Sequence, residues 1–349
     1  MFTVKFSRLA IYTFLVLATV PGRPVAALPD WYTNPTRYAR FSYDNYIIAP
    51  AGGGSHDMAR RNALGALVTR FGAVVRVNET IIESYREFAA NGMTEWASEL
   101  IDISAIEIVG GMNLIGAEVV DFWTDGNGNY FALAVMNRER TRHIYSERLR
   151  ASLEIIDNLT NMSDAEKHSL VGVSRLRAAA VFADMSISYA TVLDVLGVPQ
   201  RGLRLGEDFR READEIAATI PIGINVTGDR ARRIQGAFAG VFSSLGFRTG
   251  GVNPRYVLDV YIHIAPTGET GGAYIGPMVF AQMDLTANLT DSQTGDILLP
   301  FYFRPWPPRR AGRTLTAAEN VTISEAVIRI GSEFRDELSN YLSQLHPRR

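Results

Sequence analysis

The chain contains no cysteine among its 349 residues. This absence excludes a disulfide framework, a thiol nucleophile and the attachment of a lipid to an N-terminal cysteine. Lysine is also scarce, because nearly all basic residues are arginine and lysine occurs only at Lys5 and Lys167. The net charge of -2 provides no overall positive field, so we expect no nucleic-acid partner.

The sequence also lacks the usual motifs of catalytic and metal sites. No Gly-x-Ser-x-Gly nucleophile motif occurs. Ser55 and His56 are neighbours at a predicted helix start, where adjacent side chains do not face each other as nucleophile and base. The histidines do not show the His-Glu-x-x-His spacing of a zinc site: His56, His143, His168, His263 and His346. Four aspartates fall in turns or on polar strand faces, which favours solvated roles: Asp121, Asp125, Asp284 and Asp291. We therefore expect no catalytic residue, no metal and no cofactor.

The N-terminal residues have the pattern of a secretory signal peptide. Lys5 and Arg8 precede the apolar run Leu9–Val20, and small residues follow at Val25 and Ala27. We predict a signal peptide over residues 1–27, and an uncleaved anchor is the alternative. No later stretch approaches the roughly 20 apolar residues of a spanning helix, so we expect no transmembrane span. The expected location is the periplasm or the medium, and the absence of cysteine favours a bacterial periplasm.

The remaining residues predict an α+β fold with two small domains that are joined by a helical connector. Each domain is expected to consist of a sheet and a helix packed against it. The hydrophobic content of 47% is enough for two modest cores. The predicted parts are an α+β domain at 28–137, a helical connector at 138–220 and a C-terminal α+β domain at 221–349.

The first domain is organised around Tyr46–Leu67, which predicts a short strand, a glycine-rich turn and a helix capped by Ser55. A turn rich in Gly, Asn and Asp at Asp125–Asn129 predicts a hairpin of Gly116–Trp123 and Tyr130–Val135. The other expected elements are a strand at Val74–Tyr85, a helix at Thr94–Ile101 and a strand at Ala105–Val109.

Helical periodicity dominates the connector, and alternating patterns dominate the second domain. The expected connector helices are Arg138–Leu159, a second from a Ser163 cap to Leu196, and Glu207–Thr219. The expected C-terminal strands are Ile222–Val226, Tyr256–Ile264, Val279–Thr290 and Asp296–Phe303. The expected C-terminal helices are Arg230–Leu245 and a last helix from a capping box at Thr316 and Glu319 to about Leu345.

Several short motifs of the first domain resemble a known family. They are Pro29-Asp30-Trp31, Tyr46–Ala51 with the Gly52–Ser55 turn, the helix bearing Ala59 and Ala63, Asp121-Phe122-Trp123, and Tyr130–Leu133. Over about residues 28–137 the chain resembles the twenty-kilodalton outer-membrane lipoprotein (Lpp-twenty) family, which includes flagellar envelope proteins such as FlgP. The resemblance implies a small α+β domain in a bacterial envelope protein that acts by assembly or binding. It implies no catalytic residue, and this chain lacks the lipidated cysteine of the family.

Two segments are candidate binding sites. A strand that leads through glycines into a helix N-terminus can bind an anion, which makes Gly53, Gly54 and Ser55 candidate ligands. A purely structural turn is the favoured interpretation, because no phosphate-binding motif or lysine follows. A solvated loop is the favoured interpretation of the proline-rich segment 304–313. The alternative is a contact surface for an anionic partner, formed by Arg304, Trp306, Arg309, Arg310 and Arg313.

These patterns favour a non-enzymatic, exported cell-envelope protein that acts by protein–protein or envelope-surface contacts. The expected partner is an envelope protein or an anionic envelope surface, and a homo-oligomer is compatible with the sequence. The alternative is a periplasmic binding module for a small anionic ligand at the Gly52–Ser55 turn. A hydrolase is the least favoured hypothesis.

Overall fold

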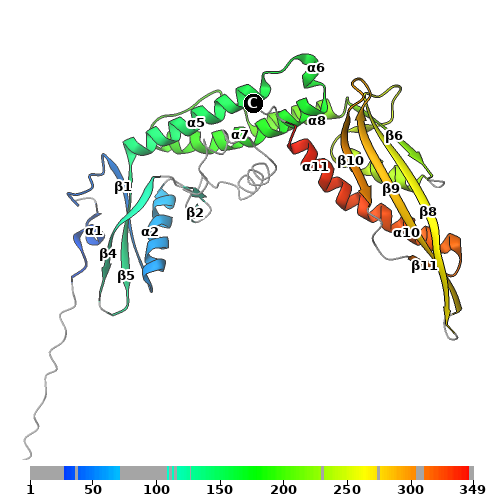
Figure 1. Ribbon diagram of the computed structural model, residues 1–349. Coiled ribbons are helices and arrows are strands. Elements are labelled where there is room, and N and C mark those ends of the chain that lie inside the picture. The colour runs from blue at the N-terminus through cyan, green and yellow to red at the C-terminus, as the bar shows by residue number, and fades with distance from the viewer. Residues whose placement is uncertain are drawn as a thin grey trace, which may run out of the picture.

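The computed structural model describes residues 27–35, 38–70, 108–109, 112–113, 116–125, 127–228, 232–272, 276–303 and 310–345. Two sheets with packed helices lie at opposite ends of a long helix pair (Figure 1). The predicted α+β class is confirmed. The expected strand Val74–Tyr85 and helix Thr94–Ile101 lie outside the described residues, as does most of the strand Ala105–Val109.

The first sheet has three antiparallel strands in the order β1-β5-β4. Its strands are β1 (Tyr46–Gly53), β4 (Ala117–Thr124) and β5 (Tyr130–Asn137), so the predicted hairpin of β4 and β5 is confirmed. The nearby short elements are α1 (Asp30–Thr33) and the paired strands β2 (Ile108–Val109) and β3 (Met112–Asn113).

Both faces of the first sheet are covered. Helix α2 (His56–Arg70) packs on one face, where the small side chains of Ala59 and Ala63 meet Ala132 and Ala134. Small side chains on both elements allow the helix to lie close to the strands. Trp31 of α1, from the N-terminal segment, packs with the opposite face in a second cluster.

Four helices follow the first sheet: α5 (Arg138–Thr160), α6 (Asp164–Lys167), α7 (Leu170–Val195) and α8 (Gly206–Ala217). The predicted single helix from Ser163 to Leu196 is wrong, because the chain turns between α6 and α7. The Ser163 side chain caps only α6, and the Ser169 side chain accepts a bond from the Gly172 amide at 3.2 Å to begin α7. An added Cβ at Gly172 would lie 2.2 Å from the Lys167 carbonyl oxygen, which shows how sharp this turn is.

Helices α5 and α7 lie side by side and contribute to two hydrophobic clusters (Figure 1). Near the first sheet, Tyr145 and Leu193 pack in the cluster that contains α2. Near the second sheet, Ile155 and Leu176 pack in the cluster that contains the C-terminal strands. Residues predicted as a connector therefore form part of both cores, and the division into domains remains a proposal.

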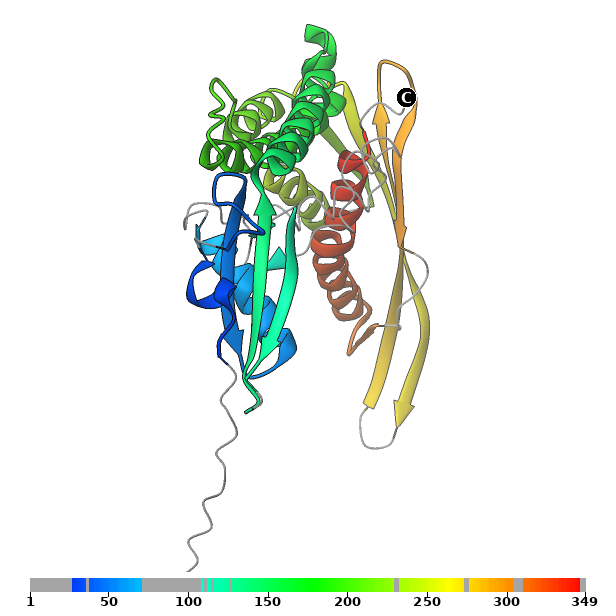
Figure 2. The same cartoon turned by 90° about the vertical axis from the view of Figure 1, so that its left-hand side faces the viewer.

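The second sheet has the strand order β10-β9-β8-β6-β7, and β11 also pairs with β9. Its strands are β6 (Pro221–Thr227), β7 (Arg248–Thr249), β8 (Tyr256–Gly272), β9 (Gly276–Asp291), β10 (Ile297–Phe303) and β11 (Arg310–Gly312). Helix α9 (Arg233–Ser244) lies between β6 and β7 in the chain, and both β7 and β8 pair with β6 in parallel. The predicted alternation is confirmed, because Leu258, Val260, Leu285 and Leu289 are all buried on one face. Strands β8 and β9 extend beyond the rest of the sheet as a long hairpin (Figure 2).

The last helical segment consists of α10 (Leu315–Arg329), the π-helical turn η3 (Ile330–Phe334) and α11 (Arg335–Ser343). The predicted cap at Thr316 is wrong, since the Thr314 side chain accepts the bond from the Ala317 amide at 3.1 Å. An N-cap residue needs an extended backbone, and Thr314 has it because the chain has just left strand β11. Phe334 of η3 is buried in the core of the second sheet, edge-on to Phe238 and Phe301.

Candidate functional site

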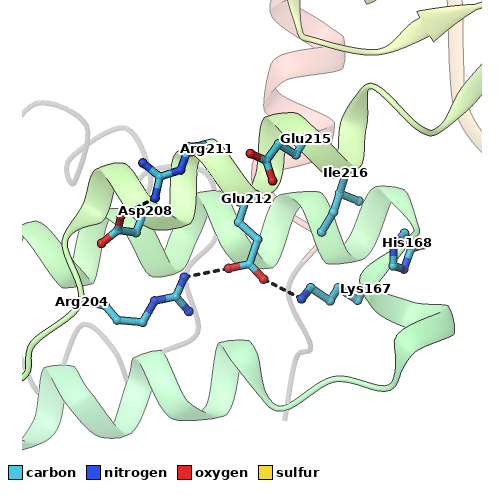
Figure 3. A pocket seen from close by; sticks show the side chains of 8 residues that line it. All are labelled: Lys167, His168, Arg204, Asp208, Arg211, Glu212, Glu215 and Ile216. Carbon is cyan, nitrogen blue, oxygen red and sulfur yellow. Dashed lines mark hydrogen bonds and ion pairs between the residues drawn. The ribbon is translucent and has the colours of Figure 1, made fainter.

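A polar hollow of about 390 Å³ lies between α6, α8 and the segment that precedes α8 (Figure 3). Helix α8 is amphipathic, with Phe209, Ala213 and Ile216 buried and its charged face turned to the hollow. The residues that line the hollow are almost all polar: Lys167, His168, Arg204, Asp208, Arg211, Glu212, Glu215 and Ile216.

Glu212 is the centre of an ion-pair network in this hollow. Lys167 Nζ lies 2.6 Å from Glu212 Oε1, and Arg204 Nη2 lies 2.7 Å from Glu212 Oε2. Hydrogen bonds from these two cations hold the pKa of Glu212 below its ordinary value. The Arg204 guanidinium also lies over the Phe209 ring, 3.8 Å from its centroid, so its position is fixed by two contacts.

Asp208 and His168 of the hollow also have polar partners. Arg211 Nη2 donates to Asp208 Oδ1 at 2.6 Å, and this bond lowers the pKa of Asp208. His168 Nδ1 lies 3.0 Å from the carbonyl oxygen of Asp164. Glu212 and Asp208 therefore each have at least one cationic partner, and the Lys167–Glu212 pair joins α6 to α8. Across the part of the chain that the structure describes, no group of three or more His, Cys, Asp and Glu residues is arranged to hold a metal ion.

The Gly52–Ser55 turn is built by close packing. Ser55 Oγ accepts a bond from the Met58 amide at 3.1 Å, and the Asn62 side chain donates to the Gly52 carbonyl at 2.8 Å. Gly53 does not have a positive φ. A Cβ at Gly53 would instead lie 2.6 Å from the Ala59 amide nitrogen, so glycine is required by the closeness of α2. Anion binding at Gly53, Gly54 and Ser55 stays a prediction.

The arginine-rich segment is described only at its C-terminal end. Arg304, Trp306 and Arg309 lie outside the described residues. Arg310 is the first residue of β11 and forms an ion pair with Glu325 of α10, which raises the pKa of Arg310. Arg313 is exposed just before α10. Arg310 thus helps to hold β11 against α10, and a partner-contact role for this segment stays a prediction.

The outer face of the second sheet is a surface that sequence reasoning missed. The strand register places Tyr261 of β8, Thr286 of β9 and Tyr302 of β10 in one row across the sheet. Tyr261 is 59% exposed and Tyr302 is 55% exposed. The sequence signal was an aromatic residue among polar ones on the outward side of an alternating strand. The sequence alone could not show which residues of the adjacent strands lie beside these tyrosines, because that depends on how the strands pair.

Comparisons with known proteins give structural similarities at low identity. The match with the secreted protein HP1454 from Helicobacter pylori covers 82% of this chain and 97% of that protein, with 10% sequence identity and a TM-score of 0.41. The match with a minor lipoprotein from Acinetobacter baumannii covers 36% of this chain and 92% of that protein, with 13% sequence identity and a TM-score of 0.24. The match with a dodecameric PelC variant from Paraburkholderia phytofirmans covers 37% of this chain and 87% of that protein, with 19% sequence identity and a TM-score of 0.21.

No protein-family model matches the chain, and no curated protein matches it. The TM-scores above are all below 0.5, so these similarities assign no function to the chain. They are similarities to a secreted protein, a lipoprotein and an oligomer, as their descriptions state.

Helix α7 is long and apolar enough to cross a membrane by length and composition alone. Half of its most apolar stretch is buried inside the protein, where it packs against α5 and α8. A core helix gives the same signal as a spanning helix, so this feature is weak support for a membrane span.

Proposed function

We propose that this chain is a non-enzymatic exported protein of the cell envelope that acts by contacts with an envelope protein or surface. The observation that carries the proposal is the outer face of the second sheet. Helices α9, α10 and α11 all contribute to the cluster on the inner face of this sheet. The outer face carries the large exposed side chains of Tyr261 and Tyr302. Exposed aromatic side chains on a rigid sheet are typical of a contact surface.

The charged hollow supports the same proposal by its chemistry. An acid–base or nucleophilic site needs a group whose partner leaves it free to react, whereas Glu212 and Asp208 are held ionised by arginine and lysine. A network of ion pairs of this kind stabilises the packing of helices.

The finer parts of the proposal come from the sequence. We infer a relationship of residues 28–137 to the Lpp-twenty family, a signal peptide that is cleaved after Ala27, and a periplasmic location. The proposal also includes the division into two α+β domains on a helical connector and contact of segment 304–313 with an anionic partner.

The test is in vivo crosslinking followed by affinity purification from periplasmic and membrane fractions. We expect a mature chain that begins at Leu28 and a reproducible crosslinked envelope component. A chain that still begins at Met1 and stays in the membrane would contradict the location. Native mass spectrometry of the purified protein separates the alternatives, because a retained small molecule favours the binding module and an oligomer favours assembly.

A further inference from the structure

Two tyrosines are aligned on the outer face of the second sheet. Tyr261 and Tyr302 are outward partners of the same residue, Thr286, on strand β9, which lies between β8 and β10. Neighbouring strands are about 4.8 Å apart, so the two tyrosines are separated by roughly 10 Å across the strands. Thr286 between them is itself exposed, and no bulky side chain of this row separates the two rings.

Rows of hydrogen-bonding side chains flank the tyrosine row on both sides. On one side, Asn225, Asp259 and Asn288 are aligned across β6, β8 and β9. On the other side, His263 of β8 is the direct partner of Asp284 of β9, and both are exposed. Residues two positions apart along a strand are separated by about 7 Å, so each polar row lies within reach of a ring that stacks on a tyrosine.

One of these polar side chains is held in position before any ligand arrives. Asn225 Nδ2 donates to Asp259 Oδ1 at 2.8 Å. This bond orients the carboxylate, whose second oxygen can still accept hydrogen bonds. A carboxylate that is oriented in advance loses little conformational freedom on binding, which favours recognition of a hydroxyl group.

We propose that this outer face binds an extended polysaccharide chain of the cell envelope. A pyranose ring offers a C–H face that packs on the electron-rich face of an aromatic ring, and its hydroxyl groups point outward from the ring edge. Tyr261 and Tyr302 provide two stacking positions, and the flanking Asp and Asn side chains provide acceptors and donors for the hydroxyl groups. A chain that runs across the strands can place one ring over each tyrosine.

The charges of the face favour a sugar over other flat ligands. Asp259 and Asp284 place two carboxylates beside the tyrosines, and among the described residues of these two flanking rows His263 is the only basic group. This arrangement repels phosphate groups, so nucleic acid and anionic lipid headgroups are poor ligands for the face. The proposal rests on the proposed function, because it names the envelope component that the contact surface recognises.

The first experiment is co-sedimentation of the full mature chain with purified peptidoglycan sacculi, together with calorimetric titration of a hexasaccharide of N-acetylglucosamine. We expect binding to both, with little change between low and high salt because the contact involves few net charges. Tyr261→Ala and Tyr302→Ala should each weaken the affinity about tenfold, as expected for loss of a central aromatic contact. The proposal is overturned if the natural protein binds neither the sacculi nor the hexasaccharide at either salt concentration.

Matched variants separate loss of the face from loss of the fold. Ile328→Ala removes a side chain that is 71% exposed on α10, away from the outer face, and should leave binding unchanged. Tyr261→Phe keeps the ring and should retain most of the affinity. If the alanine variants unfold, Thr286→Arg supplies a second test, since a long side chain between the tyrosines should block binding in a folded protein. Full binding by a folded Thr286→Arg variant would contradict the proposal.

Other ligands give distinguishable outcomes. Vesicles that contain phosphatidylglycerol test an anionic surface, and binding to them that falls with salt and persists in Tyr261→Ala would overturn the polysaccharide assignment while leaving the proposed function intact. A tyrosine-dependent dimer without sugar binding would assign the face to a second copy of the chain. The crosslinking experiment tests the proposed function separately, because its outcome does not depend on which component binds to the tyrosines.

Discussion

Lys167 at the end of α6 and Glu212 in the middle of α8 form an ion pair of 2.6 Å between two helices. Lys167 is the only lysine among the residues that the structure describes, and Arg204 contacts the second oxygen of the same carboxylate. The pair therefore joins a four-residue helix to the longer helix beside it.

The first prediction concerns this pair. Glu212→Gln should lower the free energy of unfolding at pH 7 by about 1 kcal/mol, because two partly exposed cations lose their partner. The pKa of Glu212 is lower in the folded protein, so its contribution is present above the ordinary carboxyl pKa of 4.5 and is lost as the pH falls through the lowered value. Urea unfolding should show a larger difference from the natural protein at pH 7 than at pH 3. Glu215→Gln in the same hollow is the control, and an equal effect of both changes would refute the assignment.

The second prediction concerns the turn before α2. Gly53→Ala should destabilise the protein by about 1–3 kcal/mol, because its Cβ would lie 2.6 Å from the backbone nitrogen of Ala59. Gly54→Ala is the matched control, since an added Cβ there has no atom within 4 Å. Thermal melting measures both changes. A stable Gly53→Ala variant would mean that α2 does not lie as close to β1 as the structure shows.

The third prediction concerns Arg310. Arg310→Glu should lower the melting temperature, because it places a second carboxylate beside Glu325 of α10. The double change Arg310→Glu with Glu325→Arg should restore much of the loss, since the opposite charges are again paired. Arg313→Glu should leave the melting temperature nearly unchanged, as is usual for an exposed charge, and should weaken co-precipitation of an anionic partner at low salt. If neither melting nor co-precipitation changes in any variant, the arginines of β11 and its flank are only solvated.

The fourth prediction concerns Arg175 of α7. Its side chain is only 6% exposed, and Arg175 Nε donates to the Leu159 carbonyl at 2.9 Å while Nη1 contacts Glu166. Arg175→Met should cost about 3 kcal/mol, because a buried carbonyl and a carboxylate lose their donor together. Chemical denaturation is the measurement. Arg211→Met removes a mostly exposed ion pair of α8 and should have little effect, so equal losses in the two variants would contradict the assigned role of Arg175.

The amino-acid sequence alone determined the α+β class and most regular elements. The alternation in β8 and β9 identified their buried faces, because successive strand residues point to opposite sides whatever the strand pairs with. The hairpin of β4 and β5 followed from turn residues for the same local reason. The relationship to the Lpp-twenty family, the signal peptide and both predicted binding segments remain predictions from sequence.

Only the tertiary structure decided features that depend on contacts between distant residues. The break before α7 follows from the Ser169 cap and from the closeness of Gly172 to the preceding turn, so the Ser163 cap begins only the short helix α6. The role of Gly53 is set by the approach of α2, a contact between elements that the sequence of the turn does not reveal. The row of Tyr261, Thr286 and Tyr302 joins three strands that are separated in sequence. Strand register is set by the pairing of whole strands, so a single strand cannot show which exposed side chains lie together.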